Sequence, residues 1–223
     1  MMGLPQPADG QGPCFFGVYP ALVTDIEDPD NLGRVQLRFP TLGTSGDRDV
    51  RAWATLCTPY ADKDQGLAIM PEVDSQVVVA FEAGDFRRPY VVGSSWNGKA
   101  PLPHRPRASN NIRMLRTRCD SRLEFDDTAG APKISLTTQS GHKVVMDAGS
   151  QEVTITHSNG CTIKLTASGS IDINANSSVN VTAPSLNVKA PTSTFSGVVN
   201  CQTLIASVGV VSPSYTPGVG NIW

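Results

Sequence analysis

Short apolar segments alternate with polar turns between residues 123 and 188. Each of eight segments has two apolar residues separated by one other residue, and the first members of successive pairs are 11, 10, 9, 10, 8, 8 and 7 residues apart. A period of two places both apolar side chains of a pair on the same face of a β-strand. The pairs are Leu123 with Phe125, Ile134 with Leu136, Val144 with Met146, Val153 with Ile155, Ile163 with Leu165, Ile171 with Ile173, Val179 with Val181 and Leu186 with Val188.

A strand with two inward residues cannot form a core by itself, so these segments are expected to stack as repeats that contact only their neighbours. Either one chain coils on itself as a β-helix or identical chains intertwine. The short strands and tight turns favour the second arrangement, an intertwined, triple-stranded β-helix needle in a homotrimer, with the paired residues as its core. A β-sandwich is the alternative, since its strands also recur every 8–12 residues. Against it, residues 126–194 contain no Phe, Tyr or Trp.

The first hundred residues predict longer strands and a separate domain. Asp28 to Gly33 have the composition of a tight turn between two alternating strands, which predicts a hairpin. Five strands in about 80 residues, without a convincing helix, predict a small closed barrel of the OB type, and the chain is therefore expected to be all-β. The expected strands cover residues 16–26, 34–39, 50–56, 76–82 and 89–94.

Three residues of this domain have expected structural roles. Trp53 is expected to fill the barrel interior. Gly33 and Gly84 suit turn positions with positive φ, which glycine adopts without steric cost. None of the three has a pattern typical of catalysis.

The barrel region also contains a series of short motifs in a fixed order. They are Asp28-Pro29, Gly33-Arg34-Val35, Phe39-Pro40, Trp53-Ala54, Gly66, Met70-Pro71, Val77-Val78-Val79-Ala80-Phe81, Gly84-Asp85, Arg88-Pro89-Tyr90-Val91-Val92-Gly93 and Asn97-Gly98. The series resembles the OB domain of contractile-tail spike proteins. That family includes phage baseplate assembly protein V, VgrG-type spikes and the central spikes of extracellular contractile injection systems. With the strand ladder that follows, the resemblance covers roughly residues 15–190.

The resemblance implies a structural central spike that docks on a hub and tube and punctures a target cell envelope when a sheath contracts. Some relatives carry a lysozyme domain between barrel and needle, but only about 25 residues separate Gly98 from Leu123. VgrG-type chains carry a hub domain before the barrel, whereas about 14 residues precede Phe15. The expected partners are therefore two further copies of the chain, a separate hub or baseplate protein, the inner tube and a PAAR-like capping protein at the C-terminal end.

Five regions are expected along the chain. They are a flexible N-terminal arm at 1–14, the OB-fold domain at 15–98, a linker rich in Pro and Arg at 99–119, the triple-stranded β-helix at 120–190 and a distal tip region at 191–223.

The linker contains a group of arginines without an acidic residue among them. In a trimer this group would form a basic ring, here called the collar, which is expected to contact acidic groups on neighbouring barrels or the hub. Binding of single-stranded nucleic acid is the alternative, but no aromatic residue separates the arginines as such binding requires. The collar residues are Arg105, Arg107, Arg113, Arg116 and Arg118.

The composition of the chain limits the expected binding partners and the expected compartment of assembly. The net charge of -2 and the pI near 5.9 give no general reason to bind nucleic acid or an anionic membrane. Five cysteines, far apart and without a CxxC motif, favour a reducing compartment, and the N-terminus lacks the features of a signal peptide. Assembly in the cytoplasm, as part of a phage tail or tail-like particle, is therefore expected.

No cofactor or metal site is expected. Phage relatives often hold iron at the tip through a His-x-His pair from each chain, whereas the histidines here are His104, His142 and His157, all before the tip region.

Catalysis is the main competing function, because trimeric tailspikes include polysaccharide-cleaving enzymes and polysaccharide or receptor binders. A glycosidase requires two carboxylates facing one groove, and repeats this short cannot form such a groove. His157, Ser158 and Asp147 suggest a triad, but neighbouring residues on a strand point to opposite faces. No catalytic residue is therefore predicted. A nucleic-acid-binding or sugar-binding OB module is a further alternative, disfavoured by the lack of basic and aromatic patterning on the barrel strands.

Overall fold

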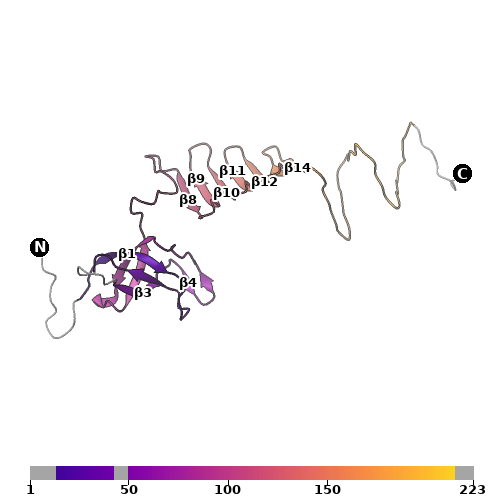
Figure 1. The fold of residues 1–223 in the computed structure, drawn as a ribbon. Coiled ribbons are helices and arrows are strands. Elements are labelled where there is room, and N and C mark those ends of the chain that lie inside the picture. Colours follow the sequence, from indigo (N-terminus) through magenta and orange to yellow (C-terminus); the bar gives the residue numbers. More distant parts are fainter. Residues whose placement is uncertain (1–13, 43–49, 214–223) are drawn as a thin grey trace. The chain divides into compact units, whose positions relative to one another are not determined.

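A computed structural model describes residues 14–42 and 50–213, shown as a ribbon in Figure 1. Most of the expected N-terminal arm and the last ten residues of the expected tip region lie outside the described residues. The chain divides into two units, residues 1–176 and 177–223, which are described separately. All but one of the regular elements in the described residues are β-strands, the exception being the short 3-10 helix η1, Glu82–Gly84.

A closed barrel forms the first part of unit 1, with the strand order β1-β2-β3-β7-β6 (Figure 1). The sequence-based prediction of a five-stranded barrel and of a hairpin at its start is confirmed, since β1 pairs antiparallel with β2. A small separate hairpin consists of β4 and β5. The bounds are β1 Val18–Asp25, β2 Arg34–Arg38, β3 Arg51–Leu56, β4 Ala61–Asp62, β5 Gln65–Gly66, β6 Gln76–Phe81 and β7 Pro89–Ser94.

Alternate residues of the barrel strands form its core. Val35 and Leu37 of β2 and Val77 and Val79 of β6 are fully buried, as the two-residue period requires. Phe81 lies at the centre of an aromatic cluster that belongs to the barrel core and the residues packed against it. Its other members are Phe15, Tyr19, Phe39 and Phe86.

The expectation that Trp53 fills the barrel interior is wrong. In the register of β2 and β3, Trp53 lies opposite Gln36, while the inward Val35 lies opposite Ala54. Trp53 is therefore on the outer face, half-buried, with the guanidinium carbon of Arg34 5.8 Å from its ring centroid. The narrow interior accepts the small Ala54 at this level, and the indole gains a cation–π contact outside.

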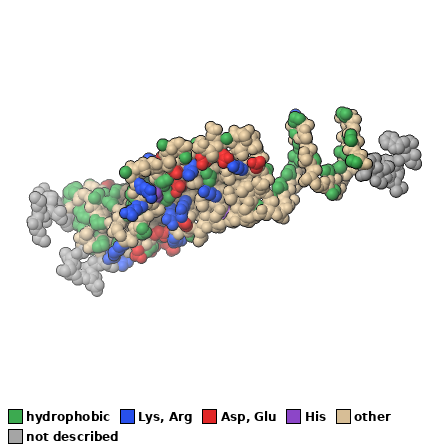
Figure 2. Space-filling model, turned by 90° about the horizontal axis from the view of Figure 1, so that it is seen from above, with side chains coloured by type: hydrophobic (Ala, Val, Ile, Leu, Met, Phe, Trp, Pro, Cys, Tyr) green, Lys and Arg blue, Asp and Glu red, His purple; other side chains and the backbone are tan. Residues whose placement is uncertain are grey.

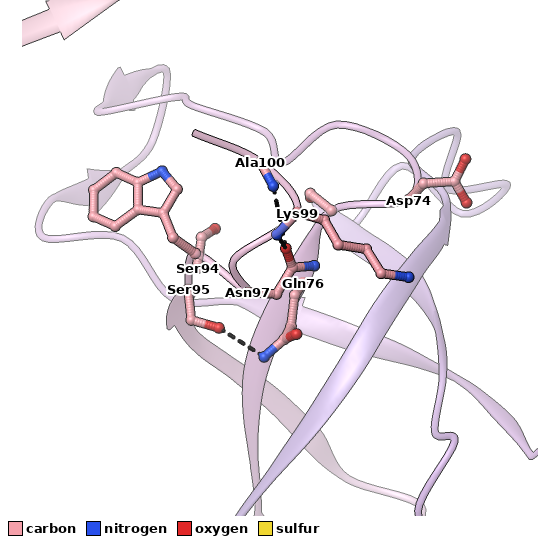
Figure 3. A pocket seen from close by; sticks show the side chains of 9 residues that line it. Asp74, Gln76, Ser94, Ser95, Asn97, Lys99 and Ala100 are labelled. Atoms are coloured by element: carbon pink, nitrogen blue, oxygen red, sulfur yellow. Dashed lines mark hydrogen bonds between the residues drawn. The ribbon is translucent and has the colours of Figure 1, made fainter. Parts of the chain in front are cut away.

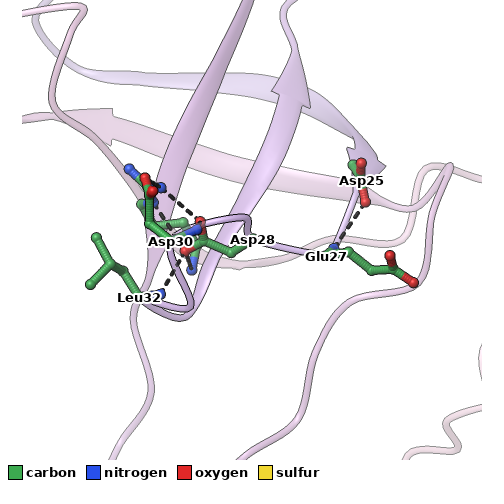
Figure 4. A network of polar contacts seen from close by, with 6 residues as sticks. Asp25, Glu27, Asp28, Asp30 and Leu32 are labelled. Atoms are coloured by element: carbon green, nitrogen blue, oxygen red, sulfur yellow. Dashed lines mark hydrogen bonds and ion pairs between the residues drawn. The ribbon is translucent and has the colours of Figure 1, made fainter.

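The turn between β1 and β2 is organised by one carboxylate, that of Asp28 (Figure 4). Its two oxygens accept hydrogen bonds from the backbone N–H groups of Asp30 (3.1 Å), Leu32 (2.8 Å) and Arg34 (3.2 Å). The Arg34 guanidinium binds the same carboxylate through Nε (3.0 Å) and Nη2 (2.7 Å). Gly33 completes the turn with a φ of +72°, and Gly84 has a φ of +81°, as expected.

These contacts give a pH-dependent prediction. The Arg34 guanidinium, with the backbone donors, holds the pKa of Asp28 well below its usual range. A lowered folded-state pKa stabilises the fold above the unfolded pKa of about 3.9, and this contribution is lost as the pH falls below that value. Asp28→Asn should therefore lower the thermal midpoint at pH 7 and have a smaller effect near pH 3. Asp30→Asn is the matched control, because its exposed carboxylate contacts only the Arg34 side chain. An equal loss for Asp28→Asn at both pH values would contradict the assignment.

A seven-stranded antiparallel sheet, here called the ladder, forms the second part of unit 1 (Figure 1). Its strand order, β14-β13-β12-β11-β10-β9-β8, is that of a meander, so every strand pairs with its sequence neighbours in the same chain. The ladder begins before residue 120 and its last strand ends before residue 190, the limits expected for the needle. The bounds are β8 Ile112–Arg116, β9 Arg122–Asp126, β10 Lys133–Thr137, β11 Lys143–Asp147, β12 Glu152–Thr156, β13 Thr162–Leu165 and β14 Ile171–Asn174.

Unit 2 contains no strand or helix over its described residues, 177–213. In Figure 2 this extended segment is dominated by hydrophobic and uncharged polar side chains, and its only charged residue is Lys189.

The single chain forms no strand at the last two apolar pairs, so the strands expected there in an intertwined trimer stay a prediction. Val179 and Val181 are 59% and 66% exposed, and Leu186 and Val188 are 70% and 68% exposed, all in irregular backbone. A β-strand requires a hydrogen-bonded neighbour, and the ladder of this chain ends at β14 without pairing to unit 2. The alternating pattern alone therefore did not suffice to form a strand after residue 174.

Candidate functional site

One face of the ladder is apolar from β9 to β14, and on β8 it holds Leu115 and Arg113. The register places the paired residues in two continuous columns, and these side chains are half-buried or exposed in the single chain, with exposed fractions from 36% for Ile134 to 66% for Ile171 among the exposed members. A contiguous apolar surface of this kind marks an interaction site. One column is Leu115, Leu123, Leu136, Val144, Ile155, Ile163 and Ile173, and the other is Phe125, Ile134, Met146, Val153, Leu165 and Ile171.

The opposite face of the ladder is predominantly polar. Lys164 Nζ lies 2.8 Å from Glu152 Oε1, and Lys133 Nζ lies 3.8 Å from Asp126 Oδ2. Ion pairs that remain partly accessible to water, as these do, contribute little to stability. These ion pairs show that one face of the ladder is compatible with solvent, whereas the opposite face is apolar. Such a sheet is expected to bury its apolar face in a larger assembly.

The structure places twelve of the sixteen predicted needle-core residues on the apolar face. It also adds one that sequence reasoning missed, Leu115 of β8, which lies opposite Leu123. The alternation in β8 favours Ile112 and Met114 as the apolar pair, but Met114 lies opposite Glu124 on the polar face. Nothing in the local pattern indicated this register, because it depends on the pairing with β9.

The other four predicted needle-core residues are not part of this face. Val179, Val181, Leu186 and Val188 belong to unit 2, where no strand aligns them with the two columns. Their side chains are exposed, and residues 177–213 contain no strand. That these four side chains line the axis of a trimer remains a prediction.

The five collar arginines do not form one group. Arg113 and Arg116 lie on β8, where Arg113 pairs with Asp127, and Arg116 Nε lies 2.6 Å from Asp120 Oδ1. Arg118 Nη1 lies 3.2 Å from Glu72 Oε2. Arg105 and Arg107 are exposed, without a carboxylate partner among the described residues. Contact between the collar and a hub remains a prediction, and these two side chains are the most available for it.

The residues considered for catalysis are far apart or already hydrogen-bonded. His157 and Ser158 lie in the turn after β12, whereas Asp147 ends β11 at the opposite edge of the sheet. The His142 and His157 rings are 4.3 Å apart between centroids, and their Nδ1 atoms accept the backbone N–H groups of Ser158 and Asn159. Within residues 14–42 and 50–213, no group of three or more His, Cys, Asp or Glu residues is placed to hold a metal ion.

A shallow pocket of about 510 Å³ lies beside the ends of β6 and β7 (Figure 3). Its polar groups bind one another: Gln76 Nε2 donates to Ser95 Oγ (3.1 Å), and Asn97 Oδ1 accepts the backbone N–H of Lys99 (3.0 Å). Trp96 and Asp74 also line the pocket. The pocket therefore has no nucleophile with an adjacent base. Across the described residues, no helix has the length and apolar character needed to cross a membrane.

Comparison with known protein families accounts for both parts of unit 1. Residues 19–96 match the type VI secretion system/phage-baseplate injector OB domain, and residues 111–189 match the phage baseplate V C-terminal trimerisation domain. The chain belongs to the family of contractile-tail spike proteins. The predicted all-β fold, an OB barrel followed by a region that forms a trimer, is thereby confirmed, whereas the intertwined, triple-stranded β-helix expected for that region stays a prediction. The amphipathic ladder lies within the trimerisation domain.

Two relatives in this family come from Vibrio cholerae serotype O1. The type VI secretion system spike protein VgrG3 is 26% identical over 130 residues, which are 56% of this chain and 13% of the relative. The actin cross-linking toxin VgrG1 is 26% identical over 116 residues, which are 49% of this chain and 11% of the relative. The chain thus matches only a small part of these relatives, one of which is by name a toxin. These matches identify a spike protein of a contractile injection system, part of a tail-like particle.

Proposed function

We propose that three copies of this chain form a non-enzymatic central spike, which is driven into a target cell envelope when the sheath of the particle contracts. The observation that supports this most is the continuous apolar face of the ladder, which coincides with the trimerisation domain of the family. Three such faces turned toward a common axis would bury the two columns and leave the polar faces in water.

Mechanical stiffness follows from the ladder. Seven strands at a spacing of about 4.8 Å form a wall roughly 30 Å long, in which each strand is hydrogen-bonded to its neighbours. Unit 2 would add to this length when its apolar residues, Val179, Val181, Leu186 and Val188 among them, meet those of two other copies. A narrow rod of this type can transmit force along its axis without a catalytic step.

The partners follow from the same role. The barrel would dock on a separate hub or baseplate protein at the end of the inner tube, with Arg105 and Arg107 of the collar available for acidic groups there. A PAAR-like protein would cap the C-terminal end. Assembly of the three chains would take place in the cytoplasm, before the finished particle acts outside.

Light scattering on the purified chain tests this proposal first. The expected mass is three times 23.7 kDa, retained in mild detergent. In cells that make the particle, deletion of the chain should abolish permeabilisation of target cells, and the wild-type chain should restore it. A monomer in solution, or particles that permeabilise target cells equally well without the chain, would overturn the proposal.

A further inference from the structure

The two lateral edges of the ladder carry opposite charge. Strands β9 and β11 run from the first edge to the second, and each begins with a base and ends with an acid: Arg122 to Asp126, and Lys143 to Asp147. Strands β10 and β12 run in the opposite direction. The end of one strand and the start of the next therefore lie on the same edge of the sheet. The first edge is called the basic edge (Arg116, Arg118, Arg122 and Lys143, with Asp120), and the second the acidic edge (Asp126, Asp127, Asp147 and Glu152, with Lys133 and Arg113).

Contacts within the chain neutralise much of both edges but leave the ends of β11 free. On the acidic edge, Asp127 pairs with Arg113, Asp126 lies 3.8 Å from Lys133, and Glu152 lies 2.8 Å from Lys164. Arg118 of the basic edge lies 3.2 Å from Glu72. On the basic edge, Asp120 is shared between Arg116 (2.6 Å) and Arg122 (2.8 Å). Lys143 is exposed and has no ion pair with any described residue. Asp147 Oδ1 accepts the backbone N–H groups of Gly149 and Ser150, and no cation pairs with its carboxylate among the described residues. The two ends of β11 therefore hold one unpaired charge of each sign.

We propose that the basic edge of one copy lies against the acidic edge of the next copy around the three-fold axis, an arrangement that rests on the proposed trimeric spike. A three-fold rotation keeps each strand at the same height along the axis. Lys143 then lies beside Asp147 of the next copy, and Arg122 beside Asp126 of the next copy. Two neighbouring sheets meet at each of three corners around the axis. The same edge contact is formed at every corner, so each complementary pair occurs three times.

This arrangement gives the charges a role that the apolar face cannot perform. The two columns drive association without specifying direction, because apolar packing is largely non-directional. A basic edge against a second basic edge would place Lys143 and Arg122 of two copies together and would repel. Opposite edges therefore select a head-to-tail ring in which all three chains run in the same direction, as charge patterns do in other specific assemblies.

Charge exchange in the full chain tests the proposal, with the trimer dissociation measured by light scattering over a dilution series at 0.15 M salt. Lys143→Glu and Asp147→Lys should each raise the concentration at which the trimer dissociates by roughly 10-fold or more, because repulsion acts at three corners. The double variant should restore the wild-type value, since the pair is reversed but still complementary. Glu124→Lys is the matched control, a charge reversal at the centre of the polar face, and should leave the trimer unchanged.

The outcomes of these experiments distinguish a failure of the proposed edge pairing from a failure of the proposed trimer. A stable wild-type trimer whose dissociation is unaffected by either single reversal would overturn the edge pairing and leave the spike intact. Loss of the trimer in the single variants without recovery in the double variant would also overturn the pairing. A wild-type monomer would overturn both. Circular dichroism of each variant confirms that the β-structure is retained.

Discussion

Ile163→Asp is expected to abolish assembly of the trimer. Ile163 lies near the β14 end of one apolar column, between Ile155 and Ile173, and is 39% exposed in the single chain. In the proposed spike the substitution places three carboxylates close to one axis without partners. The effective cost of burying an unpaired charge is several kcal/mol for each ion, and it would be met three times at one level.

The mass of the Ile163→Asp variant in solution checks this prediction, and the expected result is a monomer of 23.7 kDa. Thr154→Asp is the matched control, because Thr154 lies on the neighbouring strand β12 but in the polar face, opposite Lys164. The control should remain a trimer. An Ile163→Asp chain that assembles as a stable trimer would show that the apolar face does not point inward.

Phe81→Ala is expected to have the largest effect on the barrel. The ring of Phe81 is packed against four aromatic rings with centroid distances between 5.3 and 5.7 Å, and the residue is only 7% exposed. Removal of a buried phenyl ring leaves a cavity and typically costs about 3–5 kcal/mol. A loss of this size is a large fraction of the stability of a small domain.

Denaturant unfolding followed by tryptophan fluorescence measures the effect, since Trp53 lies on the outer face of β3. Val92→Ala is the control, because Val92 of β7 is 51% exposed and its truncation should change the free energy of unfolding by no more than about 0.5 kcal/mol. Equal unfolding midpoints for Phe81→Ala and the control would contradict the assignment of Phe81 to the centre of the cluster.

Local patterns in the sequence were sufficient for much of this fold. Alternation at Val35 and Leu37 predicted the inward face of β2, and the turn residues from Asp28 to Gly33 predicted the hairpin. The apolar pairs of the second half predicted six strands of the ladder and the face that each one presents. These predictions succeeded because strand periodicity and turn chemistry are properties of short segments.

The sequence-based predictions failed for residues whose position depends on pairing with a segment distant in the sequence. The large apolar ring of Trp53 favoured a position in the barrel interior, but the register of β3 with β2 places Trp53 on the outer face. Strand β8 was assigned to a linker, because its apolar residues follow a proline-rich stretch and only the pairing with β9 shows that Leu115 joins a column. The collar arginines, adjacent in sequence, are separated by the β8 strand and by their own carboxylate partners.

The last two apolar pairs are a separate case, because their strands were predicted for a trimer and the single chain does not test them. Val179 and Val181, and likewise Leu186 and Val188, have the spacing of the six pairs before them, yet they form no strand in the single chain. Spacing determines which side chains would share a face, whereas a strand also needs a neighbour for its backbone N–H and C=O groups. Within the described residues this chain supplies no such neighbour to unit 2.

The sequence by itself determined that this protein is built from a barrel and a run of short amphipathic strands, since each strand's apolar face follows from the spacing of its own residues. Only the tertiary structure decided that the ladder strands pair within one chain, and that this pairing aligns the apolar residues in two columns and collects bases on one edge and acids on the other. The physical reason is that register is set by hydrogen bonds between strands, and a shift of one residue would move every side chain to the other face.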